Sequence, residues 1–404
     1  WLLGRAMRPE ASAGRRRGLL ILGLVFQLGL LVAVKYAGFF FGAFIDLPKL
    51  HLPLGVSFYT FHAISYLVDV YRQKTPPQKN LLRLGLYLAL FPKLVMGPIV
   101  PYHELEPALA QRTIDAQDVS DGCFRFTIGL AKKALLADAL AGLVTGIWGD
   151  LASLTVLSAW LGLIGYALQL YFDFSGYSDM AIGLGRMLGF RFPENFRYPY
   201  LCSSISDFWR RWHISLGSWF KEYLYFPLGG SRAGTLRTLR NLLLVWLATG
   251  LWHGASWNYV LWGLYFGVLI CLEKLLAPRF RAHPRKGLLA GLYRPVCLLL
   301  AVLGWVLFRA EDLPAAGRYF ACLFGGAAGA SAQARLYLHD FWPVLLLGAV
   351  GATPLCAKLA GRLGAKLQPG VRAAVQAVLV LALLACSTVW LLNGSFQSFV
   401  YFQF

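Results

Sequence analysis

The sequence predicts an all-α polytopic integral membrane protein. Its 404 residues are 58% hydrophobic and only 14% charged, whereas soluble domains carry about 25% charged residues. Several apolar runs also reach the roughly 20 residues that a helix needs to cross a bilayer. The clearest of these runs are residues 18–44, 151–172 and 371–392. Composition and run length together therefore indicate that lipid is the solvent of this chain.

Ten segments are apolar enough to be candidate transmembrane helices. They are residues 18–44, 52–71, 84–100, 124–148, 151–172, 242–252, 259–276, 294–307, 341–359 and 371–392. The fourth contains Lys132, Lys133 and Asp138, so we expect it to be broken or partly interfacial. No internal repeat or low-complexity tract separates the segments, which predicts one membrane domain over residues 1–404. Because the chain opens on Trp1 instead of an initiator Met, we expect a truncated N-terminus.

Loop charges predict the orientation of these helices. Basic side chains gather in four short loops, at residues 15–17, 72–83, 232–240 and 279–286. Such clusters mark the cytoplasmic side of a membrane and its anionic lipids. The loop at 103–121 is mainly acidic, and we place it on the opposite side. This distribution accounts for the net charge of +19, so membrane lipid, and no nucleic acid, is the expected partner.

Residues 173–239 depart from the pattern of apolar spans. Asp, Arg, His and Lys alternate there with many aromatic side chains, and Trp and Tyr favour the membrane interface. Irregular backbone at membrane depth is tolerated where protein covers it or where it lines a water-filled cavity. We therefore expect re-entrant or amphipathic segments that line such a cavity.

The sequence Trp-His-Gly-Ala-Ser-Trp at residues 252–257 places an ionisable imidazole, His253, between two apolar runs. A side chain of this kind is a functional-site hypothesis, and a structural histidine bonded between helices is the alternative. The flanking loops at 232–240 and 279–286 are both basic, so the chain between them must enter the membrane and return. Residues 242–252 would rise about 16 Å as a helix, roughly half of a 30 Å hydrocarbon core. We therefore expect His253 at the tip of a hairpin near mid-membrane.

Signatures of several enzyme classes are absent from the sequence. Residues 176–180 lack the second glycine of a GxSxG nucleophile elbow. No histidine has an aspartate five positions later, the spacing of soluble glycerolipid acyltransferases. The cysteine and histidine spacings do not fit zinc, so we expect no metal site. The seven cysteines are expected to be buried free thiols, with Cys202 as a covalent acyl carrier the less favoured alternative.

Acyl transfer is a chemistry that the remaining polar residues permit. A neutral imidazole can take the proton of a hydroxyl that attacks an acyl carbon, and exclusion of water suppresses hydrolysis of a thioester. His253 is the candidate general base, and His213 is the candidate orienting group, with a structural role as the equal alternative. Arginine side chains fit the phosphates of an acyl donor. The candidates for shaping the substrate or donor site are Asp173, Arg210, Arg211 and Trp252.

The charged residues of this stretch also have structural interpretations. Buried charges need partners, so we expect Asp173 and Asp179 to pair with Arg186 or Arg210. The Lys221-Glu222 dipeptide is expected to form an interfacial ion pair.

Four blocks of the sequence resemble the membrane-bound O-acyltransferase family and, within it, the bacterial alginate O-acetyltransferase group. They are YFDFSGYSDMAIGLGRMLGFRFPENFRYPY (171–200), DFWRRWHISLGSWFKEYLYFPLGGSR (207–232), RNLLLVWLATGLWHGASWNYVLWGLYFG (240–267) and FVYFQF (399–404). The resemblance implies a ring of about ten helices around a central tunnel, with the active-site blocks in residues 171–267. It also implies that His253 matches the family's essential histidine and that His213 matches its second characteristic polar position. The start at Trp1 departs from the family, whose first helix is missing.

The resemblance further implies a reaction. The group is pictured as taking acetyl from a cytoplasmic thioester donor, acetyl-CoA, and delivering it across the bacterial inner membrane. A periplasmic SGNH-type partner then places it on an exported polysaccharide such as alginate, and no cofactor stays bound. Cellulose, peptidoglycan and teichoic acid are alternative acceptors. A proton-coupled transporter or flippase is the rival from another class, although the lack of an internal repeat speaks against it. A platform that only anchors a periplasmic enzyme is the third possibility.

Overall fold

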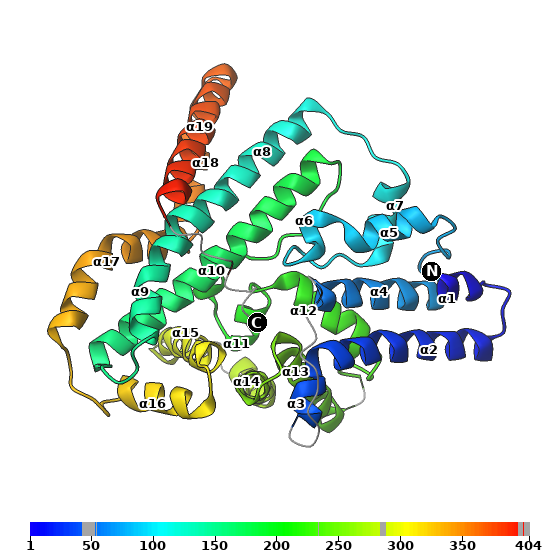
Figure 1. Ribbon diagram of the computed structural model, residues 1–404, viewed down its shortest axis with the longest axis horizontal. Helices are drawn as coiled ribbons and strands as arrows, with labels where there is room; N and C mark the ends of the chain where they lie inside the picture. The colour runs from blue at the N-terminus through cyan, green and yellow to red at the C-terminus, as the bar shows by residue number, and fades with distance from the viewer. Residues whose placement is uncertain (43–52, 54, 233, 283–287, 395–398, 400–404) are drawn as a thin grey trace. The chain divides into compact units, whose positions relative to one another are not determined.

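The computed structural model describes residues 1–404 except 43–52, 54, 233, 283–287, 395–398 and 400–404. Every element in the described residues is a helix (Figure 1), which confirms the prediction of an all-α chain. Some predicted features lie partly outside these residues. They are the adjoining ends of the segments 18–44 and 52–71, the basic loop at 279–286, and the block FVYFQF, of which Phe399 is described.

The chain divides into two compact units. Unit 1 comprises Trp1–Phe126, Met180–Glu194 and Ser215–Leu228, and unit 2 comprises Thr127–Asp179, Asn195–Ile214 and Gly229–Phe404. Three helices supply residues to both units, namely α8 (Ala116–Ala131), α10 (Val156–Met187) and α12 (Ile214–Phe220). The single domain expected over residues 1–404 stays a prediction.

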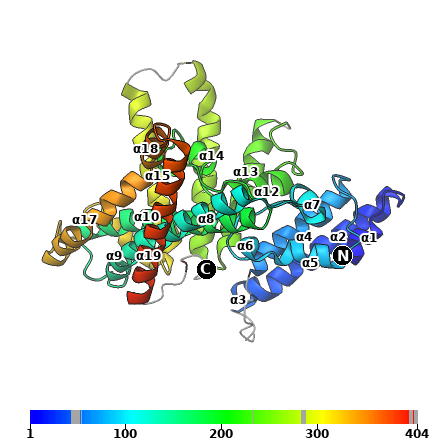
Figure 2. The same ribbon diagram turned by 90° about the horizontal axis from the view of Figure 1, so that it is seen from above.

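Unit 1 is built on two helices that lie side by side, α2 (Ala13–Leu31) and α4 (Val56–Tyr71) (Figures 1 and 2). α2 begins after Ser12, whose hydroxyl accepts a hydrogen bond from the backbone N–H of Arg15, as N-cap residues do. It continues through a π-helical turn, η1 (Val32–Tyr36), into α3 (Ala37–Phe41). The other helices of this unit are α1 (Leu2–Ala6), α5 (Leu81–Ala89), α6 (Phe91–Leu94), α7 (Tyr102–Ala110) and the π-helical turn η4 (Lys221–Tyr225).

The core of unit 1 is aromatic. Tyr102 of α7 contacts Tyr66 of α4 and Tyr87 of α5 edge to face, with ring centroids 4.9 and 5.0 Å apart. The Tyr87 hydroxyl donates to the Val100 carbonyl (2.9 Å), and the Tyr102 hydroxyl accepts from the Gln78 amide (2.9 Å). Buried hydroxyls need such partners because an unsatisfied one costs free energy. These contacts therefore hold α4, α5 and α7 together.

Unit 2 contains most of the long apolar helices. α14 (Trp257–Ala282) and α15 (Leu288–Arg309) run side by side (Figure 2). α16 (Leu313–Leu323) begins after Asp312, whose carboxylate accepts a hydrogen bond from the Ala315 N–H (2.7 Å). The other elements of this unit are η2 (Lys132–Ala137), α9 (Asp138–Trp148), η3 (Pro199–Leu201), α11 (Ile205–Trp209), α13 (Thr235–His253), α17 (Ala332–Gly351), α18 (Leu355–Gly364) and α19 (Pro369–Asn393).

The hairpin of α13 and α14 has its closest contact at two glycines. A Cβ atom at Gly250 would lie 2.3 Å from the Tyr259 carbonyl oxygen, and one at Gly263 would lie 2.4 Å from the Trp246 carbonyl oxygen. Both obstacles are backbone atoms, so they cannot rotate away as a side chain would. Small residues allow helices to approach closely in a membrane. Gly250 and Gly263 therefore set the spacing of the hairpin that carries His253.

Five helices in the described residues are long and apolar enough to cross a membrane. They are Ala13–Phe41, Val156–Met187, Trp257–Leu276, Gly291–Arg309 and Pro369–Asn393. Ala332–Gly351 and Leu355–Gly364 make a sixth if their bend of 67° marks one broken span. The multi-pass character is thus confirmed, whereas the number of about ten spans is not. The ring around a central tunnel and the depth of His253 stay predictions.

The predicted span at residues 84–100 is wrong. α5 ends at Ala89, α6 covers only Phe91–Leu94, and no helix follows before Tyr102. Pro92 explains the break, because proline lacks the N–H of a helix interior and clashes with the carbonyl four residues earlier. Leu90 is accordingly extended, with φ −61° and ψ 104°.

The prediction of re-entrant or amphipathic segments over residues 173–239 is wrong for its first part. α10 continues without a break to Met187. The glycines here permit close helix packing: a Cβ atom at Gly176 would lie 2.7 Å from the Gly129 carbonyl oxygen of α8. From residue 188 to 232, short helices alternate with turns and extended chain.

The glycine contact in the hairpin predicts a stability change. Gly263→Ala should lower the free energy of unfolding by about 1–3 kcal/mol, because the new methyl group must push the two backbones apart. The measurement is the thermal unfolding midpoint of the full-length protein in detergent. Gly29→Ala in α2 is the matched control, since nothing lies within 4 Å of a Cβ atom there. Equal midpoints for the two variants would contradict the prediction.

Candidate active site

His253 is the last residue of α13 and lies in an aromatic setting. Its imidazole is 7% exposed, and its ring centroid is 4.9 Å from that of Trp262 in α14 and 5.1 Å from that of Phe308 in α15. Gly254 ends the helix in extended conformation. A Cβ atom at Gly254 would lie 2.2 Å from the Tyr259 ring. Glycine is therefore required for the chain to turn immediately after His253.

His213 lies in the turn between α11 and α12 and is 2% exposed. Its φ of 46° is in the left-handed region, which non-glycine residues adopt at a cost of roughly 1 kcal/mol or more. Asn195 compensates: its Oδ1 lies 3.2 Å from His213 Nδ1, and its carbonyl accepts the Ile214 N–H (3.0 Å). The Asn195 amide in turn donates to the Ser178 hydroxyl (3.1 Å). With this amide orientation Nδ1 of His213 is the donor, which leaves the lone pair of the neutral ring on Nε2.

Trp252 connects the two candidate histidines. Its ring centroid is 4.8 Å from that of His253 and 6.2 Å from that of His213, and it is 5% exposed. Phe174 of α10 covers His213 at 4.7 Å between ring centroids. Three of the predicted site residues, from segments about 40 positions apart, thus meet in unit 2.

Asp173 lies in a buried ion-pair cluster. Its Oδ1 is 2.8 Å from Nζ of Lys133, which is also 2.6 Å from Asp138 Oδ1. Lys132 pairs with Asp179 at 2.6 Å. The expectation that Asp173 and Asp179 pair with arginines is therefore wrong.

The two lysines come from a π-helical turn. Residues 116–148 are helical throughout, and η2 at Lys132–Ala137 has the wider π winding. The expected break in the segment 124–148 is thus a change of winding, of a kind that is frequent at functional sites.

Arg186, which was expected to pair with Asp173 or Asp179, pairs with Asp118 and Asp121, at 3.3 and 2.5 Å.

Arg210 and Arg211 share one carboxylate on α11. Arg211 Nε lies 3.0 Å from Asp207 Oδ2, and Arg210 Nη2 lies 3.6 Å from Asp207 Oδ1. Burial raises the pKa of Asp207, but hydrogen bonds from Ser203 and Arg211 outweigh it and hold this pKa below its ordinary value. The Arg210 side chain is 70% exposed, so it is accessible to a ligand.

α11 is fastened to α14 by a carboxylate. Glu273 accepts the N–H groups of Ile205 (2.6 Å) and Ser206 (2.8 Å) at the start of α11, and the Tyr293 hydroxyl (2.5 Å). A carboxylate at a helix start satisfies N–H groups that have no partner inside the helix. Glu273 thereby positions the helix that carries both arginines.

Sequence reasoning missed Asn195, Ser178, Lys133 and Glu273 as residues that hold the site. Lys133 gave a signal, because it interrupts an apolar segment. Asn195 gave none, since its role depends on the turn that brings it to His213.

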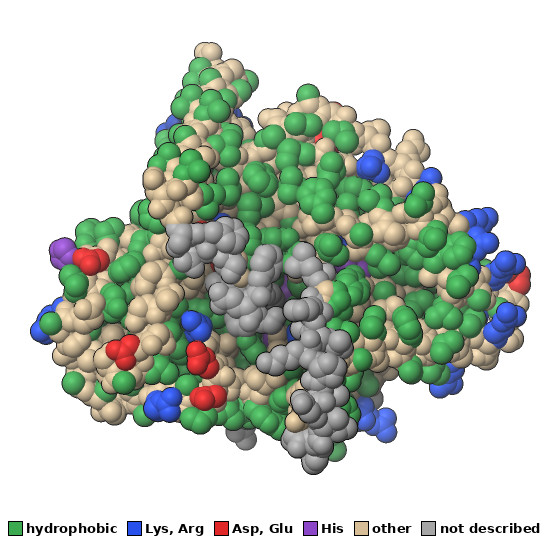
Figure 3. All heavy atoms as spheres, in the orientation of Figure 1, with side chains coloured by type: hydrophobic (Ala, Val, Ile, Leu, Met, Phe, Trp, Pro, Cys, Tyr) green, Lys and Arg blue, Asp and Glu red, His purple; other side chains and the backbone are tan. Residues whose placement is uncertain are grey.

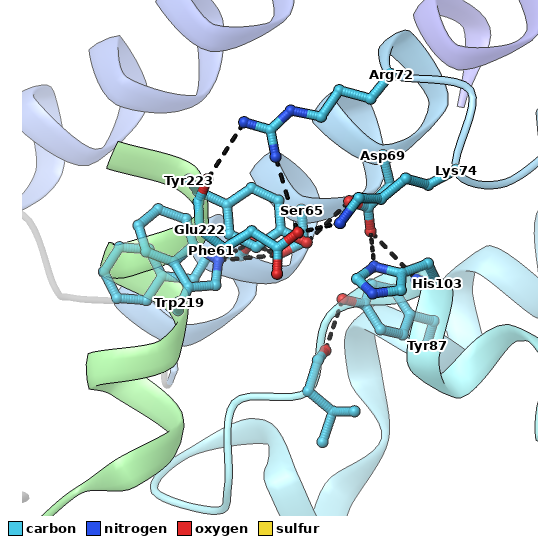
Figure 4. A network of polar contacts seen from close by, with 11 residues as sticks. Phe61, Ser65, Asp69, Arg72, Lys74, Tyr87, His103, Trp219, Glu222 and Tyr223 are labelled. Carbon is cyan, nitrogen blue, oxygen red and sulfur yellow. Dashed lines mark hydrogen bonds and ion pairs between the residues drawn. The ribbon is translucent and has the colours of Figure 1, made fainter. Parts of the chain in front are cut away.

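Unit 1 contains a separate polar network around Asp69 of α4 (Figure 4). This buried carboxylate lies 2.9 Å from His103 Nδ1 and accepts the Tyr223 hydroxyl at 2.9 Å. The nearby Ser65 hydroxyl donates to the Phe61 carbonyl (2.8 Å). Ser65 therefore does not bond to the imidazole, and the network joins α4, α7 and η4 without forming a serine triad.

Glu222 belongs to this network, and its contacts differ from the expected ion pair with Lys221. Its carboxylate pairs with Lys74 and, at 3.8 Å, with Arg72 (Figure 4). Lys221 instead lies over the Phe226 ring, 5.6 Å from its centroid. Lys221 and Glu222 face different partners, so the predicted pair is wrong.

No group of three or more His, Cys, Asp or Glu side chains within the described part of the chain could hold a metal ion.

The chain was compared with known families. The family model described as MBOAT, membrane-bound O-acyltransferase family, matches residues 74–290, more than half of the chain. The chain belongs to the membrane-bound O-acyltransferase family. The matched residues include the blocks 207–232 and 240–267, which contain His213 and His253.

Named relatives fall into three groups by acceptor. A probable alginate O-acetylase of Pseudomonas aeruginosa is 45% identical over 316 residues, covering 76% of this chain and 60% of the relative. A peptidoglycan O-acetyltransferase of Helicobacter pylori is 37% identical over 333 residues (74% and 63%). A teichoic acid D-alanyltransferase of Bacillus subtilis is 29% identical over 248 residues (56% and 62%). The chain thus spans about 60% of the length of the curated relatives that it matches.

The Lys133 cluster predicts a stability difference between neighbouring lysines. Lys133→Met should lower the free energy of unfolding by about 3–5 kcal/mol, because it removes the cation between two buried carboxylates. Lys132→Met is the matched control and should cost less, since the Lys132 side chain is 25% exposed and that of Lys133 only 7%. Thermal unfolding midpoints in detergent measure both. A larger loss for Lys132→Met would show that the buried cluster contributes little.

Cys202 offers a test of thiol reactivity outside the spanning helices. Burial raises the pKa of the Cys202 thiol to about 11, so about one molecule in a thousand holds the thiolate at pH 8. Cys123, Cys356 and Cys386 are exposed, so the expectation of buried thiols is wrong for these three. Iodoacetamide should therefore label Cys123 and Cys356 long before Cys202. Peptide mass spectrometry of folded and denatured protein at pH 8 measures the rates. Equal rates in the folded protein would restore Cys202 as a candidate acyl carrier.

Proposed function

We propose that this protein is a membrane O-acetyltransferase that acetylates an exported polysaccharide. The observation that carries the proposal is the contact of both His213 and His253 with the ring of Trp252. Both histidines lie in the part of the chain that matches the family model. Relatives named for O-acetylation of alginate and of peptidoglycan support acetyl as the transferred group and a cell-envelope polymer as the acceptor class.

In the proposed reaction, His253 is the general base. The neutral imidazole takes the proton of an acceptor hydroxyl as its oxygen attacks the acetyl carbonyl of the thioester. The C–S bond then breaks, and the departing thiolate receives the proton from the imidazolium, so an ester and a free thiol are formed. Such proton transfer contributes about 10²- to 10⁴-fold to a rate. The aromatic walls formed by Trp262 and Phe308 exclude water from the imidazole and so disfavour hydrolysis.

His213 is proposed to orient the site. Asn195 and the left-handed turn hold its ring against Trp252. That contact would keep the indole, and with it the neighbouring His253, in one rotamer. Arg210 and Arg211 are proposed to bind phosphates of the donor, because guanidinium groups match phosphate oxygens in pairs. Asp173 supports the site through Lys133.

Acetyl-CoA is the proposed donor, the bacterial inner membrane the proposed location, and alginate the proposed acceptor. The alginate O-acetylase relatives support this acceptor, whereas the relatives named for peptidoglycan and teichoic acid keep those two polymers as alternatives. Cellulose stays an alternative that no relative named here supports. A periplasmic SGNH-type enzyme is the proposed partner that completes the transfer.

His253→Ala should abolish acetyl transfer and leave the fold intact. We expect a rate loss of about 100-fold or more, the contribution of a general base. The measurement is transfer of radiolabel from acetyl-CoA to polymer in membranes that contain the full-length protein and its partner. His339→Ala is the control, because the His339 side chain is 83% exposed.

Three outcomes separate the proposal from its rivals. Normal acetylation by His253→Ala would rule out the general-base role. A wild-type protein that leaves the thioester intact while moving a solute would indicate a transporter or flippase. If the partner acetylates the polymer normally while this protein cleaves no thioester, the protein is an anchoring platform.

A further inference from the structure

A cavity of about 1120 Å³ lies within unit 1. Its walls come from α1, the turn that leads into α2, the first turn of α2 and residues 76–79 after α4. Small-molecule sites occupy about 300–1,000 Å³, so this cavity is large enough for a ligand.

The cavity is strongly basic. Arg5, Arg8, Arg15 and Lys79 line it, against a single carboxylate, Glu10. None of these five side chains forms an ion pair with another residue that the structure describes. Figure 3 shows the basic side chains gathered over α1 and the start of α2.

Two other basic side chains of unit 1 have acidic partners. Arg125 pairs with Glu194 at 2.6 Å, and Arg191 pairs with Asp118 at 2.5 Å. The cavity instead gathers four basic side chains without such a partner among the described residues in one place, where a ligand can neutralise their charge. The start of α2 adds the partial positive charge of a helix N-terminus.

The membrane context indicates the source of that ligand. Arg15 lies in the first turn of a helix that continues to Phe41 and is apolar from Gly18 onward except for Gln27 and Lys35. Leu22 and Val25 on this helix are 56% and 63% exposed. Such side chains face acyl chains in a bilayer. The cavity therefore lies where acyl chains give way to headgroups.

We propose that this cavity binds the phosphate of an anionic phospholipid headgroup. Arginine pairs with phosphate oxygens through two N–H groups at once, and basic pockets at membrane helices bind such headgroups. The bound lipid would fasten α1 and the residues after α4 to the start of α2. This inference does not depend on the acyl-transfer chemistry.

Native mass spectrometry of the delipidated full-length protein tests the proposal. Titration with phosphatidylglycerol should give a retained lipid, and titration with phosphatidylcholine should give much less, because the latter has no net charge. The double variant Arg8→Gln/Arg15→Gln should lower the affinity for phosphatidylglycerol by about tenfold or more, since each basic side chain near a membrane surface contributes severalfold.

The matched control is Arg17→Gln/Arg83→Gln, which removes the same charge from exposed side chains outside the cavity. It should change the affinity by less than about twofold, because neither side chain lines the cavity. Equal losses in both double variants would overturn the proposal in favour of general surface charge. Displacement of the lipid by excess glycerol phosphate would overturn it in favour of a soluble phosphate ligand. Lys79→Gln alone removes one exposed charge of the cavity and should also lower the affinity for phosphatidylglycerol. If neither Arg8→Gln/Arg15→Gln nor Lys79→Gln changes that affinity, the site is refuted.

Discussion

Polar groups that these helices bury must find partners within the protein, because hydrocarbon offers none. Lys133 is the clearest case in unit 2: one ammonium neutralises the carboxylates of Asp173 and Asp138. Since Asp173 belongs to α10 and Lys133 to η2, this interaction fixes the lengthwise position of α10 against its neighbour. Phe174, next to Asp173, is then placed against His213. The position of the His213 ring, the candidate orienting group, thus depends in part on this ion pair.

The site around the histidines consists of packed aromatic side chains and of strained or tightly constrained backbone conformations. His213 adopts a left-handed φ, and Gly254 leaves no room for a Cβ atom. Strained conformations persist where surrounding contacts over-determine them. Here the amide and the carbonyl of Asn195 supply those contacts on both sides of the strained residue. Preorganisation of this kind suits a reaction that needs one imidazole in one orientation.

Local patterns predicted much of this arrangement. Apolar run length identified the helices around residues 18–44, 151–172 and 371–392, and the basic loops on both sides of WHGASW predicted the hairpin of α13 and α14. The predictions were wrong where one local property of the sequence, such as hydropathy or polarity, was outweighed by another. Pro92 outweighed the hydropathy of residues 84–100, and tight glycine packing kept residues 173–187 helical despite their polarity. The partners of Asp173 and Glu222 could not be predicted, because they lie about 40 and 150 positions away in sequence.

Gly250 and Gly263 have a consequence for how the hairpin can move. Two helices in contact through side chains can slide, because side chains change rotamer as they pass. At this crossing a Cβ atom on either glycine would meet a backbone carbonyl. A slip of one residue would bring side-chain-bearing positions into that gap, so the two backbones act as a mechanical stop. Any opening of the site must therefore come from elements around the hairpin, and the hairpin itself is the stationary part against which they move.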